Sequence, residues 1–88
     1  MKIGKVIDNV WSTKKDESLI GHKFLIVQLM DKSKEFNGQV IVAADLIGAG
    51  IGEKVLVTQG SPAKYLPNMK NTPIDAVIVG IIDEEVER

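Results

Sequence analysis

Apolar and polar residues along the chain form short blocks separated by glycine, proline, asparagine, aspartate and serine. Blocks of this kind, rich in valine and isoleucine, are typical of β-strands bounded by turns. The blocks predict five strands, at Lys2–Ser12, Lys23–Met30, Gln39–Asp45, Glu53–Gln59 and Asp75–Asp83. No stretch of ten or more residues has helical apolar spacing, so we expect at most one short helical turn. That turn is predicted at Ser61–Tyr65, where Ser61 can cap and Pro62 takes the first helical position.

The number and length of these strands predict the fold class. Five short strands with turns between them favour an all-β protein, a small five-stranded barrel of the OB kind, whereas a sandwich would need more strands. The 88 residues fit one domain, residues 1–88. A domain of this size buries only about two-thirds of the surface that its unfolded chain exposes, so its own core is marginal.

Two of the predicted strands are apolar on both faces. FLIVQLM (24–30) and AVIVGII (76–82) do not alternate, although successive side chains of a strand point to opposite sides of a sheet. A small barrel buries its inward face, and the chain has no amphipathic helix to cover the outward one. Exposed apolar surface usually marks a protein interface, so we expect a homo-oligomer. The last strand places Val77, Val79 and Ile81 on one side and Ile78 and Ile82 on the other, and the first three are interface candidates. The pattern leaves open which side faces the partner.

Composition and charge exclude several classes of protein. The chain has 11 basic and 12 acidic residues, and a net charge of -1 argues against affinity built on neutralising many phosphates. It has no cysteine, which excludes disulfides, cysteine-ligated zinc and thiol nucleophiles. The N-terminus lacks the apolar stretch and cleavage site of a secretion signal, and no apolar run approaches the roughly 20 residues of a membrane span. We therefore expect a cytoplasmic protein with no membrane partner.

Three glycines lie within five positions in IGAGIGEKVLV (47–57). A dinucleotide-binding loop needs the spacing G-x-G-x-x-G at the start of a helix, whereas here the spacing is G-x-G-x-G and a strand follows. A P-loop would need a Lys-Ser or Lys-Thr pair after its last glycine. The sequence instead favours a tight corner, or a place where several copies of the loop crowd together, as at an oligomer axis.

Candidates for chemistry are few. His22 is the only histidine, and a catalytic role would need a nucleophile or carboxylate near it in space. The aspartates lie mostly at strand ends, where aspartate is a common turn residue. We therefore predict no catalytic residue, no metal site, no cofactor and no enzymatic activity. An OB module for single-stranded nucleic acid or another small ligand remains the alternative, although the stacking aromatics that it needs, Trp11 and Tyr65, are far apart in the chain.

Several motifs together resemble a known family. They are VAADLIGAGIGEKVLV (42–57), GSPAK (60–64) and DAVIVGIID (75–83), with shorter matches at residues 5–6, 11–13 and 19–28. On these residues the chain resembles the EutN/CcmL vertex proteins of bacterial microcompartments. The combination is specific, whereas any one of the motifs alone would be weak.

The resemblance implies a five-stranded OB-like barrel that forms a homopentamer and closes the fivefold vertices of a polyhedral shell beside hexameric shell proteins. It implies that Gly48, Ala49 and Gly50 approach the central axis, and that the segment with Ser61 and Lys64 belongs to the subunit interface. Three positions depart from the family pattern. Asp8 replaces a frequent glycine, and Pro62 and Lys64 replace the usual serine and arginine. Lys64 cannot reproduce a bidentate arginine contact.

Overall fold

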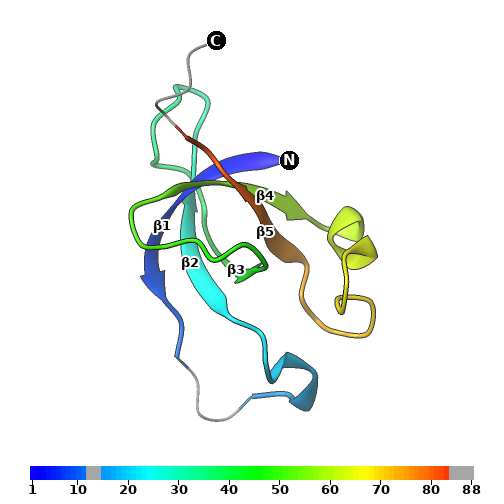
Figure 1. Ribbon diagram of the computed structural model, residues 1–88. Coiled ribbons are helices and arrows are strands. Elements are labelled where there is room, and N and C mark those ends of the chain that lie inside the picture. The colour runs from blue at the N-terminus through cyan, green and yellow to red at the C-terminus, as the bar shows by residue number, and fades with distance from the viewer. Residues whose placement is uncertain (12–14, 84–88) are drawn as a thin grey trace.

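The computed structural model describes residues 1–11 and 15–83, and these residues form an all-β fold (Figure 1). The strands are β1 (Lys2–Asn9), β2 (Phe24–Leu29), β3 (Val40–Asp45), β4 (Lys54–Gln59) and β5 (Ala76–Ile81). Each lies within a strand predicted from the sequence. The 3-10 turn η2 (Ser61–Tyr65) coincides with the predicted helical turn. The prediction for the first strand was too long, because β1 ends at Asn9; Ser12 lies outside the described residues.

The strands close into a barrel in the order β1-β2-β3-β5-β4, which confirms the predicted fold class (Figure 1). All neighbouring strands are antiparallel except β3 and β5, which run parallel. The parallel pairing joins only Ala44 to Val77 and Asp45 to Ile78. The first part of β3 is therefore paired with β2 alone.

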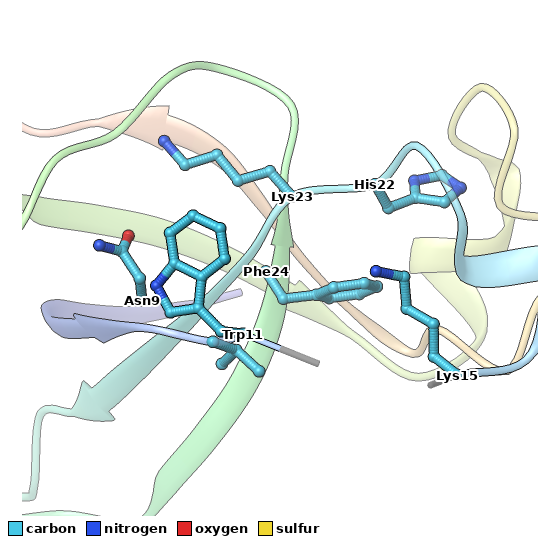
Figure 2. A pocket seen from close by; sticks show the side chains of 7 residues that line it. Asn9, Trp11, Lys15, His22, Lys23 and Phe24 are labelled. Carbon is cyan, nitrogen blue, oxygen red and sulfur yellow. The ribbon is translucent and has the colours of Figure 1, made fainter. Parts of the chain in front are cut away.

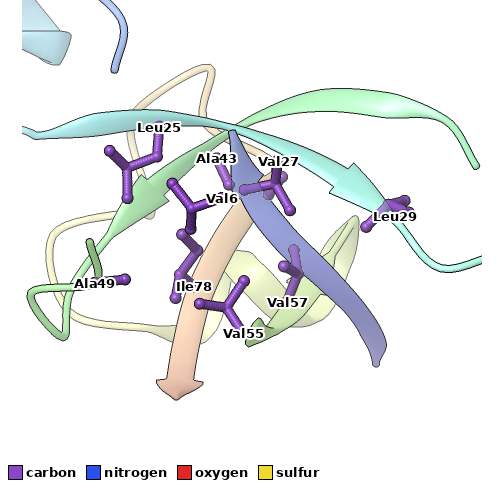
Figure 3. Packing of buried hydrophobic residues seen from close by; sticks show 10 residues of the cluster. Val6, Leu25, Val27, Leu29, Ala43, Ala49, Val55, Val57 and Ile78 are labelled. Carbon is purple, nitrogen blue, oxygen red and sulfur yellow. The ribbon is translucent and has the colours of Figure 1, made fainter. Parts of the chain in front are cut away.

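Aliphatic side chains from all five strands and one loop fill the barrel interior (Figure 3). The buried cluster consists of Val6, Leu25, Val27, Leu29, Ala43, Ala49, Val55, Val57, Ala76 and Ile78. Ala49 belongs to the glycine loop after β3, and its methyl group points toward the interior (Figure 3). The loop therefore closes one end of the barrel.

A second apolar cluster lies on the outside of β3 and β5. Its buried members are Ala44, Ala63, Met69, Ile74 and Val77, and Leu19, Phe24, Leu66 and Val79 pack against it. The segment from η2 to Ile74 supplies Ala63, Met69 and Ile74, so the chain itself covers the outer face of β5. This corrects the expectation that only a partner could cover that face. The sequence did not indicate it, because an irregular segment has no periodic apolar pattern.

A register shift in β5 changes which side chains share a face. Leu56 pairs with Gly80 and Val57 with Ile78, so Val79 is an extra residue in the β4–β5 ladder. One inserted residue reverses the alternation beyond it. Ile81 consequently pairs with Val55, whose side chain is in the barrel core. The prediction that Val77, Val79 and Ile81 share one side was therefore wrong.

Candidate functional site

The Asp45 carboxylate holds the first half of the loop between β3 and β4. Its Oδ1 accepts hydrogen bonds from the N–H groups of Ile47 at 2.9 Å and Gly48 at 3.0 Å, and its Oδ2 accepts from Ala49 at 2.9 Å. The side chain is fully buried, with the Lys23 Nζ 3.6 Å from Oδ2. The same Nζ donates to the carbonyl oxygen of Ala49 at 3.4 Å. Asp45 and Lys23 therefore fix the loop to the ends of β3 and β2.

This arrangement also answers whether the loop could bind phosphate. An anion site of this kind needs successive backbone N–H groups that point into free space. Here the three N–H groups from Ile47 to Ala49 already donate to the chain's own carboxylate. A phosphate would have to displace Asp45, so the structure gives no support for a nucleotide loop.

The glycines of the loop differ in whether the single chain requires a glycine at their position. Gly48 has φ +94° and Gly52 has φ +92°, a left-handed conformation that other residues adopt only with strain. Gly50 is not in that region, and a Cβ built on it would meet only the Glu53 Oε1, at 3.4 Å. That oxygen accepts the Gly50 N–H at 2.7 Å. The single chain therefore explains Gly48 and Gly52 but not Gly50.

The residues predicted to approach a fivefold axis are not equivalent in the single chain. Gly48 and Gly50 are exposed on the outer side of the loop, whereas Ala49 is buried in the barrel core. Only the two glycines are therefore placed to meet another subunit. Their position relative to an axis stays a prediction.

The predicted interface residues differ widely in exposure. Ser61 is exposed at the start of η2, and the Lys64 Nζ donates to the carbonyl oxygen of Thr72, which ties η2 to the segment that follows it. Val77 is fully buried and Val79 is half-buried under that same segment, while Ile81 is 39% exposed. Ser61 and Ile81 are the members that the single chain leaves most accessible.

A hollow of about 500 Å³ surrounds the only histidine (Figure 2). It is lined by Asn9, Val10, Trp11, Lys15, His22, Lys23 and Phe24. The His22 ring lies against that of Phe24, with 6.2 Å between the centroids. No carboxylate or hydroxyl nucleophile is among the described residues that line this hollow, so nothing there pairs with His22 as catalysis would require.

Other chemistry is equally unsupported in residues 1–11 and 15–83. They contain no group of three histidine, cysteine, aspartate or glutamate side chains that could hold a metal ion. Within the same ranges no helix is long and apolar enough to cross a membrane. The exposed aromatics Trp11 and Tyr65 line separate hollows, so in the described part of the chain they do not form one stacking surface.

Two features of the structure were not predicted from the sequence. Asp45 was read only as a turn residue, although aspartate followed closely by glycine is the pattern of a side chain that binds the backbone ahead of it. The sequence predicts at most one helical turn, whereas the structure has a further 3-10 turn, η1 (Glu17–Leu19). Its start has the same signal, since the Asp16 carboxylate accepts the Ser18 N–H at 2.9 Å.

Known proteins resemble this chain over nearly its whole length. Residues 1–83 match the family described as "Ethanolamine utilisation protein EutN/carboxysome". The carboxysome shell vertex protein CcmL of Thermosynechococcus vestitus is 47% identical over 83 residues, covering 94% of this chain and 84% of that protein. The structure of Gloeobacter violaceus CcmL has a TM-score of 0.87 at 44% identity, covering 94% of this chain and 86% of that one. GrpN, a pentameric microcompartment shell protein from Rhodospirillum rubrum, has a TM-score of 0.82 at 43% identity and 94% coverage of both chains.

Proposed function

The chain belongs to the EutN/CcmL family, and from this premise we propose that it forms homopentamers that occupy the fivefold vertices of a bacterial microcompartment shell. The observation that carries the proposal is the likeness to a pentameric shell protein, with 43% identity and a TM-score of 0.82 over 94% of both chains. A relative at 47% identity is named a shell vertex protein. At such identity the fold is shared.

The protein works through shape. Hexameric tiles pack into a flat sheet, because six equal sectors fill the plane around each tile. A fivefold unit in place of a sixfold one removes a sector and forces the sheet to curve. The relatives are named shell proteins, so we assign this chain no catalytic step. We propose hexameric shell proteins as its neighbours in the shell.

Within the pentamer, the glycine loop lies toward the central axis. Gly50 supports this placement, because neither its backbone conformation nor its neighbours within the chain require a glycine. A backbone that approaches other copies of itself does require one. Gly48 stands beside it on the exposed surface, while Ala49 anchors the loop in the barrel.

Shell closure tests the function. Hexameric shell proteins of the source bacterium are produced with and without this chain, and the assemblies are imaged by electron microscopy. Closed polyhedra that require this chain are the expected result, with sheets or open tubes in its absence. Polyhedra that close equally well without it would contradict the vertex role.

A further inference from the structure

The outer face of β2 and β3 carries an apolar surface that the chain leaves open. Its members are Ile26, Val40 and Val42, which we name the outer sheet patch. Ile26 and Val42 are register partners, and their sequence neighbours Leu25, Val27 and Ala43 fill the barrel core, so these two side chains point outward. Val42 is 54% exposed. The covering segment from η2 to Ile74 protects Ala44 and Val77. It borders the patch, because Pro73 and Ile74 line one hollow with Val42, but it leaves Val42 mostly exposed.

A second open apolar surface lies on the loop at the end of the barrel. Leu46, Ile47 and Ile51, which we name the loop patch, are all exposed, Ile51 by 60%. The loop is fixed by the Asp45 carboxylate at its start and by the Glu53 carboxylate, which accepts the Gly50 N–H. It also lies against β1, since the Gly52 N–H donates to the Val6 carbonyl oxygen at 2.8 Å. Three large apolar side chains on a fixed loop indicate a contact surface.

A ring of identical subunits needs two different surfaces on each subunit. The contact in such a ring is heterologous, so the surface that a subunit offers to one neighbour differs from the surface it offers to the other. The outer sheet patch lies on the wall of the barrel, and the loop patch lies at one end. None of their six side chains carries a charge, so their own packing buries no unpaired ion. The exposed Asp8 is the register partner of Ile26 on β1 and borders the outer sheet patch, where it would lie at the margin of the contact.

From these observations, and resting on the proposed pentamer, we propose that the loop patch of each protomer packs against the outer sheet patch of the next. A stable interface takes about 800 Å² from each partner, so two contacts would use about a quarter of the 6033 Å² surface of the chain. The six side chains form the apolar centre of such a contact. Exposed residues beside them, among them Gly48 and Gly50, supply its margin.

Two single substitutions test the pairing, each placing a charge in one patch. Val42→Lys disables the outer sheet patch and Ile51→Lys disables the loop patch. Neither side chain belongs to a buried cluster, so both variants should keep the β-sheet circular dichroism of the wild type. Ile20→Lys is the matched control, because Ile20 is 66% exposed and lies in neither patch. The molar mass of each protein is measured by light scattering behind a sizing column.

The wild type and Ile20→Lys are expected at five times the 9.6 kDa mass of the chain, and the other two variants at the mass of one chain. An equimolar mixture of Val42→Lys and Ile51→Lys should then give a species of two chains. Val42→Lys retains an intact loop patch and Ile51→Lys retains an intact outer sheet patch. These two patches can form one contact, and neither chain can then bind a third. If either variant stays pentameric, or the mixture stays monomeric, the pairing is wrong although the pentamer stands. A wild type that is itself a monomer would refute the proposed function and this pairing together.

Discussion

Replacing Asp45 by alanine should loosen the glycine loop while leaving the strands in place. The substitution removes the acceptors of three backbone N–H groups, those of Ile47, Gly48 and Ala49. It also removes the partner of Lys23. Because Ala49 closes the end of the barrel, a loop that loses its anchor also loses its hold on the core.

The loss of unfolding free energy on this substitution can be worked out from the solvent exposure of each hydrogen bond. The bond from Ala49 is partly buried, and a hydrogen bond to a charged acceptor in such a place is worth about 2 kcal/mol. The N–H groups of Ile47 and Gly48 are exposed, so water can replace the carboxylate and each bond contributes about 0.5 kcal/mol. Lys23 is 54% exposed, and its ion pair adds little. The unfolding free energy should therefore fall by about 3 kcal/mol.

Urea unfolding followed by far-ultraviolet circular dichroism measures this loss, at equal chain concentration because the stability of an oligomer depends on it. With a slope of roughly 1–1.5 kcal/mol/M, the midpoint should fall by roughly 2–3 M. Lys23→Met is the control, since it removes the ion pair and the 3.4 Å bond to the Ala49 carbonyl oxygen but keeps all three N–H acceptors. Its expected cost is below about 1 kcal/mol. A loss under about 1 kcal/mol for Asp45→Ala, or an equal loss for Lys23→Met, would refute the idea that the backbone bonds to Asp45 shape the loop.

Three further predictions address the loop, the second cluster and a surface turn. Gly48→Ala should lower the unfolding free energy by about 1–2 kcal/mol, because Gly48 has a left-handed backbone conformation. Gly50→Ala should leave the unfolding free energy of the subunit unchanged, but its pentamer should dissociate at a higher concentration on dilution. A Gly50→Ala pentamer that resists dilution as well as the wild type would contradict crowding at the axis. Met69→Ala removes a fully buried side chain and should cost about 2–5 kcal/mol in urea unfolding, and a loss below 1 kcal/mol would mean that the covering segment contributes little. The pKa of Asp31 lies below its ordinary value of 3.8, and the main cause is the hydrogen bond that the Ser33 hydroxyl donates to the Asp31 carboxylate. The ionised carboxylate therefore stabilises the fold at pH values above 3.8, and this stabilisation is lost as the pH falls through the lowered pKa. Ser33→Ala should raise this pKa in an NMR titration of the carboxyl carbon, and an unchanged pKa would exclude the hydroxyl as its main cause.

The strands could be predicted because their signals are local. Alternating or continuous apolar runs, bounded by residues that favour turns, are properties of a few neighbouring positions. All five strands were predicted, with ends displaced by at most three residues. Ser61 and Pro62 likewise predicted η2, since proline is suited to the first turn of a helix. The expected cap was wrong, because the N-cap is Gly60 and no side chain makes a capping hydrogen bond there. The closed barrel then followed from the number of strands.

The surface could not be predicted in the same way, because it depends on contacts between distant segments. Met69 and Ile74 cover Val77 from an irregular stretch, and the extra residue at Val79 turns Ile81 toward the side of the core. Neither effect leaves a periodic pattern in the sequence. The outer sheet patch could be suspected from the two-faced second strand, but the loop patch emerges only when Asp45 and Glu53 fix the loop.

The mass of the protein in solution tests the central claim most directly. Native mass spectrometry of the purified, untagged chain, with dilution into the low micromolar range, separates the possible assemblies without any assumption about shape. The account predicts a species of five chains of 9.6 kDa each that persists on dilution. A single chain, or an assembly with another number of subunits, would contradict it.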